Sequence, residues 1–289
     1  MTRWRVLGAS VTGTLHAEHQ RRCEDAHGWS IGDELTVIAV ADGAGSRPGT
    51  SALGSHMAVA TALSRGHEQA DSHALATDAE AVACLIVEKV VEALAQEAEA
   101  QGLELGRLAT TLCVALLDDD HVTVAQVGDG VAVIEHEDGR IETVAHADRF
   151  EYANEVVFVT AADALEHLKV FAASGVRSVA LSTDGLRYKI LDDLHAGAPF
   201  EPFFRDSFYY ARSDVGTSAG IAAFLREVED QTGDDKTLVL AVDAFAGEPG
   251  ETFQLTGRPP ASAAAVEPQE PEVEPDLRRA TGESEETSS

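Results

Sequence analysis

Seven acidic residues lie beside short apolar runs that predict β-strands, and these side chains are the ones best placed to do chemistry. They are Glu24, Asp25, Asp42, Asp129, Asp184, Asp234 and Asp235. If the strand ends converge, the carboxylates repel one another unless cations neutralise them or protons are retained. Carboxylate oxygens are hard ligands that suit Mg²⁺ or Mn²⁺, whereas clustered imidazoles and thiolates suit zinc. The pattern therefore predicts a site for hard divalent cations.

Paired divalent cations suit one reaction class in particular. Two ions about 3.5–4 Å apart can share a hydroxide as nucleophile and stabilise an in-line displacement at phosphorus. Asp42 ends an apolar run, and Gly43 and Gly45 follow it, allowing positive φ and close approach of the backbone to a ligand. A single Asp-Gly pair is more often a hairpin turn than a ligand. The recurrence of the pair nevertheless favours metal-assisted hydrolysis of a phosphate ester.

The spacing of apolar residues changes along the chain, and it predicts the elements that position these carboxylates. Helical spacing begins near Ser51 and again near Val82, with a polar loop predicted over Ser64–Asp78. Short β-rich runs follow, joined by turns too short for βαβ crossovers. These runs are Thr110–Leu117, His121–Val127, Gly130–Glu135 and Ile141–Ala145. The order predicts an α+β fold in which helices cover antiparallel sheets.

Other stretches carry less regular patterns. Thr14–Glu24 is polar and turn-like, so His16 and His19 within it are interpreted as loop histidines. Strands are predicted at Val156–Thr160 and Val176–Ser182, with a helix or irregular stretch between them. The remaining predicted elements are a strand at Trp4–Gly13, strands at Ala26–Ile31 and Leu35–Ala41, helices at Pro202–Ala211 and Ser218–Glu229, and a strand at Thr237–Val242.

Composition bounds the domain organisation and the partners. With 289 residues and 44% hydrophobic content, the chain can bury one sizeable core. The segment 246–289 is rich in Pro, Glu, Ala and Ser, so it can bury too little apolar surface to offset the conformational entropy lost on ordering. We therefore expect a domain over 1–245 and a disordered acidic tail. The formal charge of −29 argues against nucleic-acid or anionic-membrane partners.

The cysteines and the hydropathy pattern bear on location. Cys23, Cys84 and Cys113 are scattered and show no CxxC spacing, which indicates reduced thiols rather than a disulfide frame or a zinc site. No signal peptide is visible, and no apolar run approaches the roughly 20 residues of a membrane helix. We therefore expect a soluble, cytoplasmic protein.

Motifs in a fixed order resemble one family, the metal-dependent protein phosphatases of the 2C type. The resemblance spans about the first 245 residues. Each motif alone is weak, whereas their order and spacing together are specific. The motifs are CEDAH (Cys23 to His27), VADGAGS (Val40 to Ser46), ATTLCVAL (Ala109 to Leu116), QVGDG (Gln126 to Gly130), LSTDGL (Leu181 to Leu186) and GDDKTLVL (Gly233 to Leu240).

The resemblance implies a fold and a metal-ligand set. The fold would be a four-layer α-β-β-α sandwich of two mainly antiparallel sheets flanked by helices. Asp42 would bridge two Mn²⁺ or Mg²⁺ ions and a hydroxide, and the Gly43 carbonyl would join one ion. Asp184 and Asp234 would bind the other ion. The further implied residues are Glu24 and Asp25 for the second ion, directly or through its waters, Asp129 for a third, looser ion or a metal water, and Asp235 in a supporting role.

Two positions depart from the family pattern. Animal members carry a histidine, the candidate general acid, two residues after the bridging Asp, and here that position is Ala44. The phosphate-binding arginine falls at Gln20, so Arg21 is the candidate substitute and Arg22 a weaker one. The segment EYANEVVF (Glu151 to Phe158) resembles a bacterial subgroup of the family.

Three hypotheses follow from the sequence. The first is a metal-dependent phosphatase of phosphoserine and phosphothreonine in proteins, with a Ser/Thr kinase or its substrates as partners. The second is a non-catalytic regulatory or binding module that keeps the fold, motivated by Ala44 and Gln20. The third is an acidic metal-binding protein of unrelated chemistry. The complete set of Asp42, Asp184 and Asp234 favours the enzyme, because a module without turnover has less need of it.

Overall fold

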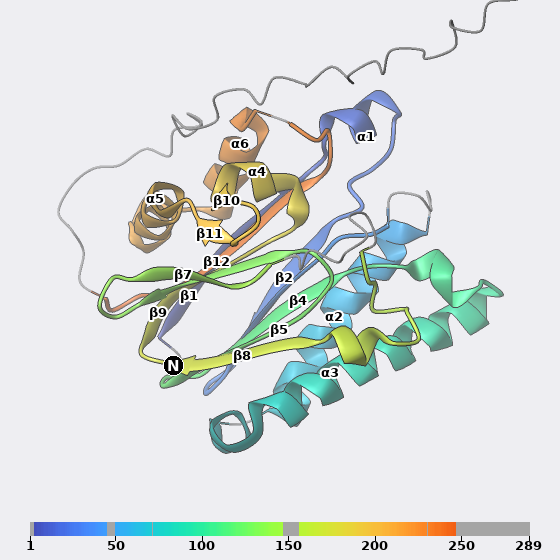
Figure 1. The fold of residues 1–289 in the computed structure, drawn as a ribbon, viewed down its shortest axis with the longest axis horizontal. Coiled ribbons are helices and arrows are strands. Elements are labelled where there is room, and N and C mark those ends of the chain that lie inside the picture. The colour runs from blue at the N-terminus through green and yellow to red at the C-terminus, as the bar shows by residue number, and fades with distance from the viewer. Residues whose placement is uncertain (1–2, 45–49, 71, 147–155, 230, 247–289) are drawn as a thin grey trace, which may run out of the picture.

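A computed structural model describes residues 3–44, 50–70, 72–146, 156–229 and 231–246 of the chain (Figure 1). Two five-stranded sheets form its centre, and every neighbouring pair of strands in them is antiparallel. The first sheet has the order β2-β3-β4-β5-β8 and the second the order β1-β12-β9-β6-β7. The strands are β1 (Trp4–Val11), β2 (Ala26–Ile31), β3 (Thr36–Ala41), β4 (Leu112–Leu117), β5 (His121–Val127), β6 (Val131–His136), β7 (Ile141–Ala145), β8 (Lys169–Ser174), β9 (Val176–Ser182) and β12 (Lys236–Asp243).

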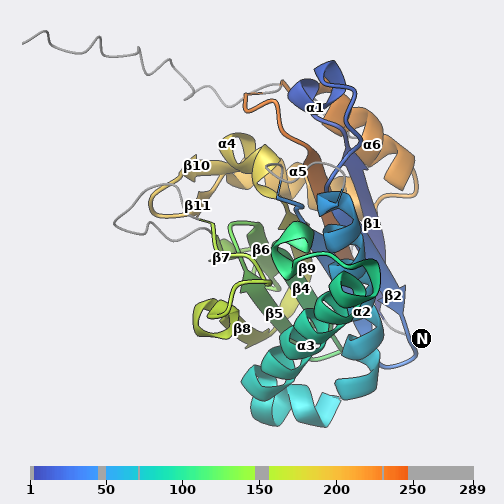
Figure 2. The ribbon, with the colours of Figure 1, turned by 90° about the vertical axis from the view of Figure 1, so that its right-hand side faces the viewer.

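Helices cover the outer faces of both sheets, as the two views at right angles show (Figures 1 and 2). Helices α2 and α3 lie on the first sheet, and α4, α5 and α6 lie on the second. A two-stranded sheet of β10 and β11 lies beside α4. The elements are α1 (Thr14–Glu18), α2 (Ser51–Gln69), α3 (Ser72–Gln101), α4 (Arg187–Ile190), α5 (Glu201–Arg212), α6 (Ser218–Glu227), β10 (Leu191–Asp193), β11 (Ala198–Pro199) and the 3₁₀ turns η1 (Leu105–Leu108), η2 (Ala164–His167) and η3 (Asp184–Leu186).

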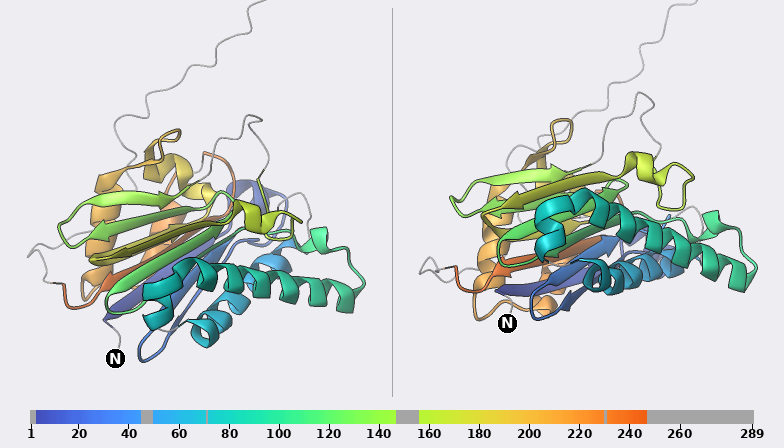
Figure 3. Two further views of the ribbon diagram at one scale, coloured as in Figure 1. Left: turned by 60° about the horizontal axis from the view of Figure 1, so that its bottom comes forward. Right: turned by 90° about the horizontal axis from the view of Figure 1, so that it is seen from below.

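Three apolar cores separate the four layers. One lies between α2, α3 and the first sheet, and includes Val37, Ile86 and Leu94. A second lies between the two sheets, around Ile38 and Leu181. The third packs α4, α5 and α6 on the second sheet. Because β3 is covered on both faces, all six of its residues are buried, which explains its unbroken apolar run. The views from below show this layering (Figure 3), and the predicted four-layer α+β sandwich is confirmed.

Some predicted elements are wrong. Residues 156–160, which the structure describes, form no strand; the fifth strand of the first sheet is β8, in the stretch predicted as helix or irregular. β8 forms a strand because it pairs with β5 along its whole length. It is only half-buried, so its own sequence carries a weak strand pattern. The loop predicted over Ser64–Asp78 is mostly helix, since α2 continues to Gln69 and α3 begins at Ser72.

The remaining sequence predictions concern the ends and the surroundings of the domain. The turn predicted over Thr14–Glu24 contains the short helix α1. Most of the segment Glu151 to Phe158 and nearly all of the acidic tail from 246 lie outside the described residues. Within the described part of the chain, no helix combines the length and apolar character needed to cross a bilayer.

A buried ion cluster fastens α5 to the second sheet. Glu135 on β6 accepts hydrogen bonds from Ser178 at 2.7 Å and from the guanidinium groups of Arg177 and Arg212. Burial alone would raise the pKa of Glu135, but these three donors together hold it below its ordinary value. The side chains of Glu135 and Arg212 are only 3% and 8% exposed, so each depends on the other for neutralisation.

We expect Glu135→Ala to destabilise the protein by about 3–5 kcal/mol, because it leaves the Arg212 charge buried without its partner. Urea denaturation at pH 7 measures the change. Glu142→Ala is the matched control: Glu142 pairs with Arg140 and His136 at the surface, and its loss should cost at most about 1 kcal/mol. Equal losses in the two variants would contradict the assignment of Glu135 as a buried anchor.

Candidate metal centre

Asp42 is delivered to one end of the sandwich by β3, which ends at Ala41. Its backbone is fixed on both sides: its N–H donates to Thr111 Oγ1 at 3.0 Å, and its carbonyl accepts from the N–H of Thr111 at 2.9 Å and from Thr110 Oγ1 at 2.8 Å. These contacts use the main chain only. The Asp42 carboxylate is therefore left to face the other acidic groups.

Gly43 continues this turn in a space that only glycine fits. Its N–H donates to the Glu24 carbonyl at 3.2 Å, and Ser55 Oγ donates to the same carbonyl at 2.5 Å. A Cβ at position 43 would lie 2.7 Å from the Ser51 carbonyl oxygen and 2.9 Å from that of Glu24. Close approach of three backbone segments therefore explains the glycine after Asp42.

Asp184 comes to the same place from the second sheet, at the start of η3 and directly after β9. The turn is packed against the chain near Asp234, since a Cβ at Gly185 would lie 1.8 Å from the Asp235 carbonyl oxygen. Carboxylate oxygens of Asp42, Asp184 and Asp234 all lie within 4.8 Å of one another. The structure thus brings together the three residues that the sequence singled out for its metal hypothesis.

The proximity of these groups perturbs their protonation. Burial, together with the carboxylates of Asp129 and Asp234, raises the pKa of Asp184 to about 7, although Arg187 and a hydrogen bond with Asp42 oppose the rise. Burial and the carboxylates of its acidic neighbours likewise raise the pKa of Asp42 well above its ordinary range. Both shifts have the sign expected for like charges in a poorly solvated place.

Asp25 joins the two sheets at this end. Its Oδ2 accepts hydrogen bonds of 2.7 Å from Thr183 Oγ1 and from Thr237 Oγ1, both on segments of the second sheet. Burial raises its pKa well above the ordinary value, while the two hydroxyls lower it. The sequence predicted Asp25 but missed both threonines; their positions beside Asp184 and Asp235 were the available signal.

Asp129 lies at the edge of the group, in the turn between β5 and β6. Burial raises its pKa, whereas the charge of Arg187 lowers it. Arg187 also lowers the pKa of Asp184, and its Nε is buried without a hydrogen-bond partner among the described residues. No sequence motif had indicated Arg187 as a cation beside the acidic group.

Glu24 and Asp235 have different surroundings from the three clustered aspartates. Arg21 Nη2 donates to Glu24 Oε2 at 2.5 Å, after a turn in which Gln20 takes a φ of 55°. Asp235 accepts from the backbone N–H groups of Gly13 at 2.8 Å and of Glu24 at 2.6 Å. The supporting role predicted for Asp235 fits these contacts, since both of its oxygens hold backbone.

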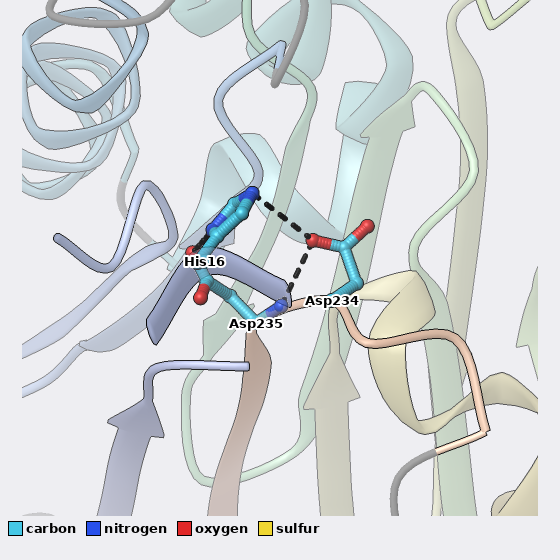
Figure 4. Close-up of side chains that lie close together, drawn as sticks. All are labelled: His16, Asp234 and Asp235. Carbon is cyan, nitrogen blue, oxygen red and sulfur yellow. Dashed lines mark hydrogen bonds and ion pairs between the residues drawn. The ribbon is translucent and has the colours of Figure 1, made fainter. Parts of the chain in front are cut away.

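His16 is the main correction to the sequence interpretation. It lies on α1 and is 8% exposed, rather than in an open loop, because α1 packs against the segment before β12, where the Leu15 N–H donates to the Gly233 carbonyl at 2.9 Å. His16, Asp234 and Asp235 form a second group whose candidate ligand atoms lie within 4.8 Å of one another (Figure 4). His19, by contrast, is exposed at the end of α1, as expected for a surface histidine.

The donor set fits a hard divalent cation. Asp184 Oδ1 is buried and has no hydrogen-bond partner among the described residues, so it is available to a water or a metal ion. Three clustered carboxylates supply oxygen donors of the kind that Mg²⁺ and Mn²⁺ select. Cys23 lies beside this group, where its thiol donates to the Asp25 carbonyl at 3.8 Å, and burial together with the Asp25 and Asp235 charges raises its pKa, so it adds no thiolate donor.

Comparison with known proteins gives a consistent result. The family model described as protein phosphatase 2C matches residues 12–226. Serine/threonine-protein phosphatase 3 of Escherichia coli (strain K12) is 29% identical over 252 residues, covering 83% of this chain and 98% of that protein.

Two solved structures resemble the fold. The catalytic domain of serine threonine protein phosphatase PstP in complex with two manganese ions has a TM-score of 0.56 at 19% identity, covering 83% of this chain and 97% of that one. A bacterial serine phosphatase has a TM-score of 0.61 at 17% identity, covering 82% and 97% of the two chains. At this identity the likeness concerns the fold alone, which has two antiparallel sheets flanked by helices.

We expect Asp184→Asn to stabilise the metal-free protein at pH 8. Folding raises the pKa of the Asp184 carboxyl from 3.8 to about 7, so the folded state binds the proton more tightly than the unfolded state. The free energy of unfolding therefore falls as the pH rises through about 7 and this proton is lost. Removing the charge should therefore raise the free energy of unfolding at pH 8 by on the order of 2 kcal/mol.

The gain in the free energy of unfolding that Asp184→Asn gives should become smaller as the pH falls toward 5, because the wild-type carboxyl then takes up its proton. Chemical denaturation in EDTA at the two pH values measures the difference. Asp119→Asn, at an exposed position in the β4–β5 turn, is the control and should change little at either pH. A gain for Asp184→Asn that is equal at both pH values would contradict the repulsion argument.

Proposed function

The chain belongs to the protein phosphatase 2C family, and from that premise we propose that it is a metal-dependent phosphatase of phosphoserine and phosphothreonine in proteins. The observation that carries the proposal is the convergence of Asp42, Asp184 and Asp234, with one buried carboxylate oxygen, Asp184 Oδ1, that has no hydrogen-bond partner in the described part of the chain. The E. coli relative, named a serine/threonine-protein phosphatase, supports the substrate class.

The proposed metal sites use the acidic end of the sandwich. Asp42, with the Gly43 carbonyl, Asp184 and Asp234 would hold two Mn²⁺ or Mg²⁺ ions, with Glu24 and Asp25 acting directly or through waters. Asp129, at the edge, is the proposed ligand of a third ion. When bound, the ions would lower the pKa of a water and neutralise the charge that develops on the phosphoryl oxygens.

The chain's own residues would hold the substrate. Arg21 is the proposed phosphate-binding residue, since its guanidinium already reaches the acidic group at Glu24. Ala44, which is 7% exposed, offers no proton donor two residues beyond Asp42. We therefore assign protonation of the departing serine or threonine oxygen to solvent water.

The proposed partners are phosphorylated proteins, namely a Ser/Thr kinase or its substrates. The net charge of −29 favours phosphosites flanked by basic residues over nucleic acid or anionic membranes. The three free cysteines suit a reducing compartment, and we propose a cytoplasmic location on that ground.

The proposal predicts manganese-dependent hydrolysis of p-nitrophenyl phosphate and of a phosphothreonine peptide. Asp42→Asn should lower kcat by about 10²–10³-fold, the usual loss when one electrostatic contributor to the transition state is removed. Asp119→Asn is the matched control and should retain full activity, because Asp119 is an exposed turn residue. EDTA should abolish turnover in the wild type.

Absence of turnover above the Asp42→Asn background, in wild-type protein shown to be folded by circular dichroism, would refute the enzyme. If that protein still binds Mn²⁺, the non-catalytic regulatory module becomes the better account. A change confined to KM in Asp42→Asn would also contradict its proposed role.

Arg21→Ala should raise the KM for p-nitrophenyl phosphate about 10–100-fold, because one charge-assisted hydrogen bond to the phosphate is lost. Arg22→Ala is the control, since Arg22 is the neighbouring exposed arginine and should leave KM unchanged. Steady-state kinetics with saturating Mn²⁺ separate the two variants, and the reverse order of effects would assign the phosphate contact to Arg22.

A further inference from the structure

A buried histidine faces the acidic group from α1, the element that follows the first strand. Figure 4 shows the His16 ring between the carboxyl groups of Asp234 and Asp235. The His16 side chain is 10% exposed, and that of Asp235 is 1% exposed. The Asp234 side chain is 40% exposed, so the group opens to solvent on that side.

The two ring nitrogens of His16 have different surroundings. Nδ1 lies 2.9 Å from Asp235 Oδ2, an ion-pair contact too oblique to be a hydrogen bond. Nε2 faces Asp234 Oδ1 at 4.0 Å. One nitrogen is thus set against a carboxylate, and the other is left facing a second carboxylate at a separation that is too long for a direct bond.

Asp235 cannot turn away from the ring to serve another partner. Its Oδ1 accepts from the Gly13 N–H, and its Oδ2 accepts from the Glu24 N–H. Those contacts fix Asp235 to the segments on both sides of α1. They also leave Asp235 as a support for the ring, whereas Asp234, whose Oδ1 accepts from the Asp235 N–H at 2.8 Å, is the more exposed carboxylate beside it.

The separation of Nε2 from Asp234 fits two ligands of one ion. Ligand atoms that each lie about 2.1 Å from a metal can be up to about 4.2 Å apart. A metal-ligating histidine commonly has its other ring nitrogen against a carboxylate, which orients the ring. In His16, Nε2 has the required separation from Asp234 Oδ1, and Asp235 Oδ2 is the carboxylate oxygen that lies 2.9 Å from Nδ1.

We propose that His16 Nε2 is a nitrogen ligand of a divalent ion held at Asp234. Imidazole suits transition metals better than Mg²⁺, which prefers oxygen ligands and retained water. The mixed site therefore selects Mn²⁺ over Mg²⁺. This inference rests on the proposed function in one respect, namely that Asp234 binds a divalent ion.

The test uses the full-length chain loaded with Mn²⁺ and a readout other than activity. Pulsed electron paramagnetic resonance detects ¹⁴N coupling to Mn²⁺ only when a nitrogen is bound to the ion. Wild-type protein should show this coupling, and His16→Gln should lose it. His19→Gln is the matched control, because His19 is an exposed histidine of the same segment, and it should keep the coupling.

Metal affinity gives a second measure. Isothermal titration should show Mn²⁺ binding weakened about 10-fold in His16→Gln, with Mg²⁺ binding changed by less than about twofold. Absence of ¹⁴N coupling in the wild type, or its survival in His16→Gln, would overturn the nitrogen ligand.

The outcomes separate this inference from the proposed function. If the wild type binds Mn²⁺ and hydrolyses phosphate without ¹⁴N coupling, only the His16 assignment fails. If the wild type binds no Mn²⁺ at all, the proposed function and the His16 assignment fail together.

Discussion

Repulsion among buried carboxylates is the constraint on which the acidic end of this protein depends. Asp42, Asp184 and Asp234 have oxygens within 4.8 Å of one another, and burial raises the pKa of Asp42 and Asp184. Such an arrangement is unfavourable unless protons or cations neutralise it. The grouped carboxylates therefore lower the stability of the metal-free fold, as functional sites commonly do.

The rest of the sandwich supplies what holds the group together. Antiparallel pairing puts the start of β2 beside the end of β3, and the end of β9 beside the start of β12. Asp25 then joins the two sheets through the hydroxyls of Thr183 and Thr237. Hydrogen bonds to Thr110 and Thr111 fix the backbone of Asp42, and the Asp235 side chain holds the backbone N–H groups of Gly13 and Glu24.

Short-range patterns allowed much of the fold to be predicted, because a buried strand or a helical face leaves a period in the sequence. β5 and β7 begin and end at the predicted residues. The predictions failed where pairing outweighed local pattern, as at β8, a half-buried strand at the sheet edge. They failed again at α1, whose five residues carry too little periodicity to be recognised.

The family, the layered fold and the identity of the clustered aspartates could all be read from the chain, because strand-end Asp-Gly turns in a fixed order are local motifs. Which side chains face those aspartates depends on the folded arrangement. His16 and Arg187 carry no local signal, since their surroundings come from the packing of α1 against the segment before β12 and from the position of α4. The spacing of apolar residues along a chain predicts the helix or strand to which a residue belongs. The partners of its side chain depend on contacts between segments that are distant in the sequence.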